Sequence, residues 1–251
     1  MIAPEENGHG KLPGPLLIVL HLVPGIIFAV FFYVLSWMLI PRGLTAYLAL
    51  LITIPACLVP TQIGVMLLWS VRSTGTTSLS EAIRYRRKGT VVEYVVLPLL
   101  LLVCCGVLSI VSSPITQYLG AHLPAWFPVW ATQEALISGV TSSPPIQRNI
   151  TFLLAVLLSG FVAPVADELY FRGFLLPRME HWGWAAPVVN SLLFAVYHFY
   201  FPENVAIIFV AFLPIACVVR STKNWAIGAV VHIMFNLWGV FTVFAFLPKM
   251  A

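Results

Sequence analysis

The 251-residue chain is 60% hydrophobic and only 9% charged, and its mean hydropathy is +0.96. Soluble domains carry about 25% charged residues, so this composition excludes an ordinary soluble protein and indicates a polytopic membrane protein. The formal net charge of +4 is interpreted as a topology signal, because Lys and Arg gather in the cytoplasmic loops of membrane proteins. We therefore expect membrane lipid, and no nucleic acid, as a partner.

Apolar runs long enough to cross a bilayer follow one another along the chain. The segment 120–140 is the doubtful one, because it is rich in Trp and Pro and Trp at that density is typical of the headgroup region. With spans of about 20 apolar residues, the sequence predicts an all-α fold, a polytopic transmembrane helix bundle with about seven to eight spans. The predicted spans are Leu16–Ile40, Leu44–Val71, Val91–Ser112, Ile150–Tyr170, Ala185–Phe201, Asn204–Val219 and Trp225–Leu247.

The basic residues are distributed unevenly between the two sides of this predicted bundle. With the N-terminus inside, only Arg42, Arg148 and Lys249 fall outside. The positive-inside rule thus predicts a multi-pass integral membrane protein with a cytoplasmic N-terminus, in the plasma (inner) membrane if the source is a prokaryote. The basic cluster 84–88 is also predicted to contact anionic lipid headgroups. The residues predicted to be cytoplasmic are Lys11, Arg72, Arg84, Arg86, Arg87, Lys88, Arg172, Arg178, Arg220 and Lys223.

One short run departs from the apolar pattern. Asp167, Glu168 and Arg172 lie at the end of the predicted helix Ile150–Tyr170. Ionisable groups at membrane depth are costly and usually face a cavity or a partner. Residues four apart share a helix face, so Glu168 and Arg172 can pair, whereas Asp167 points about 100 degrees away from Glu168. This run is therefore the first candidate for a catalytic site.

Two later predicted helices carry polar residues at the same spacing. Phe194 and His198 are four residues apart, and so are His232 and Asn236, so each pair shares one helix face. Three helices can thus bring two carboxyl groups, two imidazoles and an amide into one cluster. These groups supply what amide hydrolysis by water requires: a base for the water, a proton carrier for the leaving amine and donors for the oxyanion.

Each motif also has a structural interpretation. The two acids and Arg172 fit the cytoplasmic boundary of a helix, and the later motifs, including His198 or His232 alone, fit hydrogen bonds between helices. A transporter would use the same charges as a proton or substrate relay, but the sequence shows no paired repeats or matched broken helices. The occurrence of three complementary motifs on successive helices favours a catalytic site.

Taken in chain order, the three motifs resemble those of the CPBP intramembrane proteases, the CAAX protease and bacteriocin-processing family that is also called Abi. The resemblance runs from about residue 150 to residue 247. It implies N-terminal transmembrane helices and loops over 1–149 and a CPBP-like catalytic helical core over 150–251. The matching motifs are Asp167-Glu168-x-x-x-Arg172, Phe194-x-x-x-His198 and His232-x-x-x-Asn236.

The resemblance implies an intramembrane CAAX-type endopeptidase that cuts a peptide or a membrane protein near the membrane. It also implies a role for each motif residue: Asp167 and His198 activate a water molecule, His232 and Asn236 stabilise the oxyanion, Glu168 is a supporting acid, and Arg172 holds the acidic pair in place.

The sequence departs from the family pattern at its first acid, where Asp167 replaces the usual Glu. Losing one methylene withdraws the carboxylate by roughly 1.5 Å, and displacements near 1 Å can cost about a hundredfold in rate. Three outcomes are open: Asp167 still serves as base, Glu168 takes over, or the site is silent and the chain is a membrane scaffold or regulator. We favour the active enzyme.

We expect no cofactor at this site. Zinc stays open as an alternative, because Glu, His and Asn are plausible ligands and the family has been described both as metalloproteases and as glutamate-type proteases. The chain has no His-Glu-x-x-His zinc motif. The predicted spans place Glu168 near the cytoplasmic surface but His198 and His232 about 12 to 16 Å inside it, so the motif helix must tilt or start farther out. If the motifs converge, we expect the cavity to open toward the cytoplasmic half.

Overall fold

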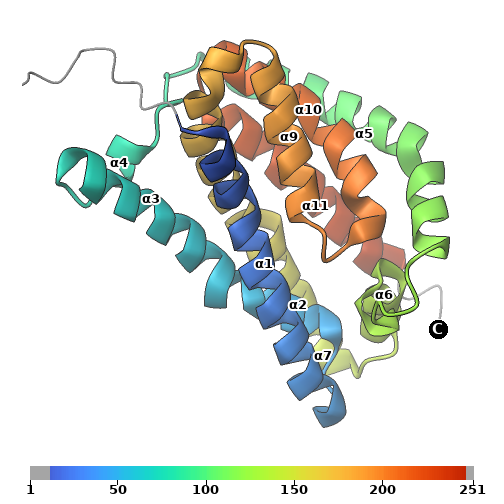
Figure 1. Cartoon of the computed structure of the whole chain (residues 1–251). Helices are drawn as coiled ribbons and strands as arrows, with labels where there is room; N and C mark the ends of the chain where they lie inside the picture. The colour runs from blue at the N-terminus through green and yellow to red at the C-terminus, as the bar shows by residue number, and fades with distance from the viewer. Residues whose placement is uncertain (1–11, 247–251) are drawn as a thin grey trace, which may run out of the picture.

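The computed structural model describes residues 12–246, and this part of the chain is a bundle of helices without a β-sheet. The predicted all-α polytopic bundle is confirmed (Figure 1). The helices are α1 (Gly14–Leu39), α2 (Ala46–Thr53), α3 (Val59–Thr74), α4 (Leu79–Ala82), α5 (Val91–Ala121), α6 (Gln133–Thr141), α7 (Pro145–Leu154), α8 (Ala163–Asp167), α9 (Ala185–Tyr197), α10 (Val205–Thr222) and α11 (Trp225–Phe246). Short 3₁₀ or π segments join or extend them: η1 (Ile40–Arg42), η2 (Ile54–Leu58), η3 (Val129–Ala131), η4 (Ala155–Val162), η5 (Glu168–Leu175), η6 (Leu176–Trp182) and η7 (Pro202–Asn204).

Six continuous helical stretches of the described chain are long and apolar enough to cross a membrane. The predicted count of seven to eight spans is not confirmed, because α9 has only 13 residues and extends about 20 Å, less than the roughly 30 Å of a hydrocarbon core. The doubtful segment 120–140 holds the last two residues of α5, η3 and most of the short helix α6. The six stretches are Gly14–Arg42, Ala46–Thr74, Val91–Ala121, Pro145–Trp182, Pro202–Thr222 and Trp225–Ala245.

The helix that carries the first motif is longer than the sequence predicts. The predicted end at Tyr170 is wrong, since the helix runs without interruption from Pro145 to Trp182. It does not end at the charged run because the charges there pair inside the bundle instead of meeting water. Asp167 therefore lies about 33 Å from Pro145 along the axis and about 22 Å from Trp182. This position removes the mismatch in depth between the first motif and the two histidine motifs.

Two of the basic residues predicted to be cytoplasmic lie inside the longer helix. Arg172 in η5 and Arg178 in η6 are 0% and 1% exposed, so neither is in a loop. Lys11 and Lys249 lie outside the described residues, as does the predicted end of the last span at Leu247. The remaining basic residues still favour the same side of the bundle, and the orientation of the N-terminus stays a prediction.

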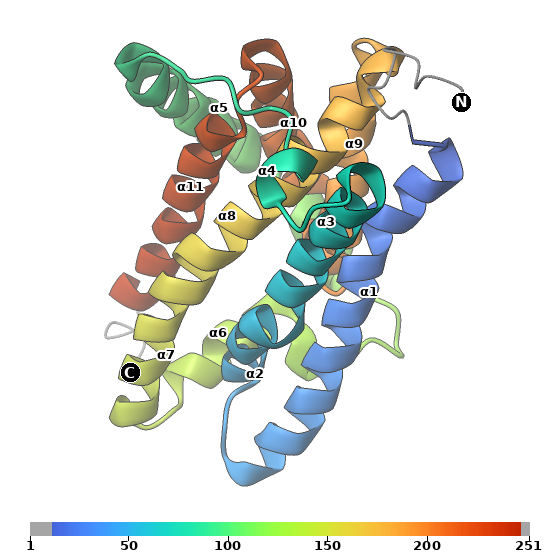
Figure 2. The same cartoon turned by 90° about the vertical axis from the view of Figure 1, so that its left-hand side faces the viewer.

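Close packing and buried polar contacts fix the helices around the motif helix. A Cβ on Gly25 of α1 would lie 2.3 Å from the carbonyl oxygen of Tyr197, so only glycine lets α1 approach α9 this closely. In the same interface Asn190 Nδ2 donates to His21 Nε2 at 3.0 Å and to the Phe171 carbonyl of η5 at 3.1 Å. Figure 2 shows α8 beside α3, which it contacts. These contacts hold α1, α3 and α9 against the charged segment.

The bundle has two distinct ends. One, here called the α6 end, carries the α1–α2 connection, α6 and the α9–α10 turn, and the other, the α4 end, carries α4, the segment 83–90 and the α10–α11 turn (Figure 1). At the α4 end Trp225 N donates to the Tyr85 carbonyl at 2.9 Å, and the Tyr85 hydroxyl donates to Glu180 Oε1 at 2.5 Å. Burial and the Glu180 carboxylate raise the pKa of Tyr85. The segment 83–90 is thereby fastened to the helix ends.

Candidate active site

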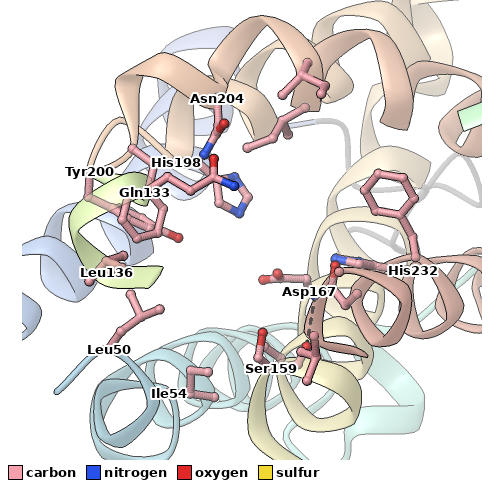
Figure 3. Close-up of a pocket in the computed structure, with 18 of the residues that line it drawn as sticks. Leu50, Ile54, Gln133, Leu136, Ser159, Asp167, His198, Tyr200, Asn204 and His232 are labelled. Carbon is pink, nitrogen blue, oxygen red and sulfur yellow. Dashed lines mark hydrogen bonds between the residues drawn. The ribbon is translucent and has the colours of Figure 1, made fainter. Parts of the chain in front are cut away.

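A cavity of about 460 Å³ lies inside the bundle, between α2, α6, the α9–α10 turn, α11 and the η4–α8 part of the motif helix. Four of the six predicted site residues line it: Asp167, His198, His232 and Asn236. Glu168 and Arg172 do not line it and lie behind the wall. Figure 3 shows Asp167 and His198 on opposite walls of the open space, with His232 on the side of Asp167.

Asp167 is 4% exposed and is held by a residue from the N-terminal half of the chain. Gln62 Nε2, on α3, donates to Asp167 Oδ1 at 2.7 Å, and Gln62 is itself fully buried. Sequence reasoning missed Gln62. The one signal available was a neutral amide inside the apolar helix Val59–Thr74, where a polar group needs a partner because burial without one is costly.

Glu168 points away from the cavity, as the 100-degree step between neighbouring helix residues predicts. Its Oε1 lies 3.0 Å from Arg172 Nη1 and 3.2 Å from His232 Nδ1. Both Glu168 and Arg172 are fully buried, and the Arg172 guanidinium lies 4.0 Å from the centre of the Phe194 ring. Glu168 therefore connects the motif helix to α11. Its partner Arg172 also lies over the rings of Phe194 and Phe212.

The two histidines present their second ring nitrogens differently. His198 follows the last residue of α9, and its Nδ1–H donates to the Phe194 carbonyl at 2.8 Å. A carbonyl can only accept, so this bond fixes the tautomer and leaves the Nε2 lone pair of a neutral His198 free. His232 turns Nδ1 toward the Glu168 carboxylate, so its Nε2 is the atom that remains for the cavity.

Asn236 lies one helical turn after His232 on α11. Its Nδ2 donates to the Ser159 carbonyl in η4 at 2.9 Å, which leaves its second N–H available. Tyr200, Gln133 and Asn204 also line the cavity (Figure 3) and were not predicted from the sequence. They lie in or beside turns, where no helical spacing relates them to the motifs.

A zinc site would draw its His, Cys, Asp or Glu ligands from the described residues. Among them, no group of three or more His, Cys, Asp or Glu side chains is arranged to hold a metal ion. Glu168 is engaged with Arg172 and His232, and Nδ1 of His198 is engaged with a backbone carbonyl. The described residues therefore do not supply the three protein ligands of a catalytic zinc site.

The fold and the site define a multi-pass α-helical membrane protein with a carboxylate–histidine cluster buried in its C-terminal helices. Residues 149–238 match the family model described as type II CAAX prenyl endopeptidase Rce1-like. The match confirms the resemblance that the three motifs indicate, and it covers all of them. No curated protein and no solved structure matches the chain.

The contact between Glu168 and Gly228 of α11 gives a first prediction. A Cβ at position 228 would lie 2.5 Å from Glu168 Oε2 and 3.0 Å from Val219 Cγ2. Gly228→Ala is therefore expected to displace the Glu168 carboxylate from His232 and to lower the free energy of unfolding by about 1–3 kcal/mol, as overpacking of a core does. Denaturant unfolding in detergent measures this.

A matched control comes from α5. Gly106 is also a helical glycine, and a Cβ there would meet nothing within 4 Å. Gly106→Ala is expected to leave stability unchanged or slightly raised, because Ala is the better helix former. Equal effects of the two substitutions would contradict the close packing of Gly228 on Glu168.

Proposed function

We propose that this protein is a membrane-embedded endopeptidase in which a water molecule, activated by Asp167 and His198, hydrolyses a peptide bond in the cavity. The observation that supports this most is the placement of a buried carboxylate and an imidazole with a free Nε2 on opposite walls of one cavity. The Rce1-like family match supports the same reaction class. A general acid or base placed in this way contributes about 10²–10⁴-fold to a rate.

In the proposed reaction, Asp167 takes a proton from water as the water oxygen attacks the carbonyl carbon of the substrate. The carbonyl π electrons move to the oxygen, which becomes an oxyanion. His232 Nε2–H and the free N–H of Asn236 donate to this oxyanion, a contribution that is large in a site without bulk water. The oxyanion then re-forms the C=O bond as the C–N bond breaks and its electron pair passes to the nitrogen. His198 carries the proton from Asp167 to that nitrogen, so the products are a carboxylic acid and an amine.

The buried charges suit this assignment. Glu168 lies between Arg172 and His232. The proposal requires His232 to donate through both ring nitrogens, with Nδ1–H to the Glu168 carboxylate and Nε2–H to the oxyanion. Glu168 thus acts through His232 as a positioning residue. Arg172 fixes Glu168 in turn, so both residues behind the wall have a function in the proposal.

The experiment that tests the proposal is cleavage of a pool of tagged membrane peptides by purified protein in liposomes. His198→Ala is expected to lower the cleavage rate by about 10²–10⁴-fold. His122→Ala is the matched control, because His122 is exposed, lies outside the cavity, and contacts the backbone carbonyl oxygen and the ring of Tyr118 at the end of its own helix. This variant should cleave like the wild type.

A chelator arm separates the water-activated mechanism from a zinc enzyme. Unchanged cleavage in chelator is expected, and loss of cleavage that added zinc restores would overturn the metal-free mechanism. Absence of cleavage by the wild type, while another family member with a Glu-Glu motif cuts the same pool, would favour the alternative of a catalytically silent membrane scaffold or regulator.

A further inference from the structure

The cavity occupies only one half of the bundle. From Asp167 and His232 its walls extend toward the α6 end, through Leu50 of α2 and Leu136 of α6. The lining includes Gln133, at the start of α6, which is exposed. The cavity therefore reaches the surface at the α6 end, and the basic segment 83–90 contributes nothing to its lining.

The described charges distinguish the two ends of the bundle. Seven exposed or partly exposed Lys and Arg side chains of the described chain lie at the α4 end, together with Glu81, Glu93 and Glu180, whereas Arg42 and Arg148 lie at the α6 end with Glu134 and Glu203. The positive-inside rule places the basic end in the cytoplasm. With this assignment, which stays a prediction, the cavity opens on the side opposite to the cytoplasmic half expected from the sequence. The exposed or partly exposed cations at the α4 end are Arg72, Arg84, Arg86, Arg87, Lys88, Arg220 and Lys223, and the buried Arg178 donates to the Ala82 carbonyl of α4.

The lining also restricts what can bind. It contains no Lys or Arg, and Asp167 is its only carboxylate. Most of the wall is aliphatic or aromatic, and near the surface the polar groups are the neutral side chains of Gln133, Tyr200 and Asn204. Neutral donors and acceptors suit a peptide backbone. Beside these three residues, on the wall opposite His232 (Figure 3), a free carboxylate or a phosphate would be buried without a cation, which costs free energy.

We propose that the cavity receives an uncharged, apolar peptide segment from the extracytoplasmic side of the membrane, as part of an exported or membrane-anchored protein. This inference rests on the proposed function for the cutting of the segment, but the entry side and the chemistry of the occupant are properties of the cavity itself. The substrate would thus be an internal segment and not a charged chain end.

Cysteine labelling in intact cells tests the entry side. The four native cysteines, Cys57, Cys104, Cys105 and Cys217, are first replaced by Ala, and Gln133→Cys is introduced at the mouth. A membrane-impermeant maleimide is expected to label Gln133→Cys in intact cells. Lys88→Cys, exposed in the basic segment, is the matched control and should label only after permeabilisation. The reverse pattern would overturn the proposed entry side.

Protection from labelling tests the occupant and needs no catalysis. An uncharged apolar peptide is expected to slow labelling of Gln133→Cys several-fold, whereas the same peptide with a central Glu should give no protection. Equal protection by both peptides, or by neither, would contradict the proposed occupant. A protein that labels and is protected as expected but cuts nothing would refute only the endopeptidase function, so the two failures are distinguishable.

Discussion

Replacing Asp167 with Asn is expected to lower kcat by about 10²–10⁴-fold, the range for loss of a general base, with the fold intact. The Asn side chain has nearly the same shape, and its Oδ1 can still accept from Gln62 Nε2, the bond that measures 2.7 Å in the structure. It can no longer take a proton from water. Steady-state cleavage and thermal unfolding of the same preparation separate the two effects. Activity within a few-fold of the wild type would show that Asp167 is not the base.

Gln62 is expected to set the position of this shorter acid. Asp167→Glu advances the carboxylate by roughly 1.5 Å, one carbon–carbon bond, and displacements of that size can cost about a hundredfold in rate. Gln62→Asn shortens the partner by the same bond. The double variant Asp167→Glu with Gln62→Asn should therefore recover most of the lost activity, and each single variant should not. The double-mutant cycle measures the coupling directly, and additive losses would contradict the positioning role.

The parts of the fold that the sequence predicts are those set by local pattern. Apolar runs locate the membrane helices, and the i, i+4 spacing places Glu168 beside Arg172 and turns Asp167 away from both. The end of the motif helix was predicted wrongly at Tyr170 because charged residues usually mark a membrane boundary. Here their partners come from α11 and from the same helix, so the charges are satisfied inside the bundle.

The parts that the sequence could not supply depend on contacts between distant segments. Gln62 meets Asp167 across 105 residues of chain, and a single amide in an apolar helix has no spacing that relates it to a motif. Residues of the predicted N-terminal part, such as Tyr47 and Leu50, line the cavity with the motifs. The division of the chain at residue 149 stays a prediction, but the cavity draws on both sides of it. Motif order also does not say which half of the bundle is hollow.

Replacing Glu168 with Ala is expected to give the largest loss of stability, about 3–5 kcal/mol in the free energy of unfolding, because it leaves a buried charge without its partner. The stranded charge is Arg172, whose side chain is fully buried, with Phe194 4.0 Å from the guanidinium. His232 loses its partner at Nδ1 as well. Denaturant unfolding in detergent measures the loss, and Glu93→Gln, at the exposed Arg87 pair of α5, is the control that should stay close to the wild type.

A second substitution distinguishes a stranded charge from a simple loss of packing. In Glu168→Ala with Arg172→Met the buried charge is removed, and replacing a buried pair by apolar side chains is often neutral or stabilising. The double variant is therefore expected to be more stable than Glu168→Ala alone. It should still cleave poorly, because His232 has no carboxylate to orient it. Recovery of stability without recovery of kcat would show that the ion pair orients His232. A double variant less stable than Glu168→Ala would instead show that Arg172 holds the helices together through its other contacts.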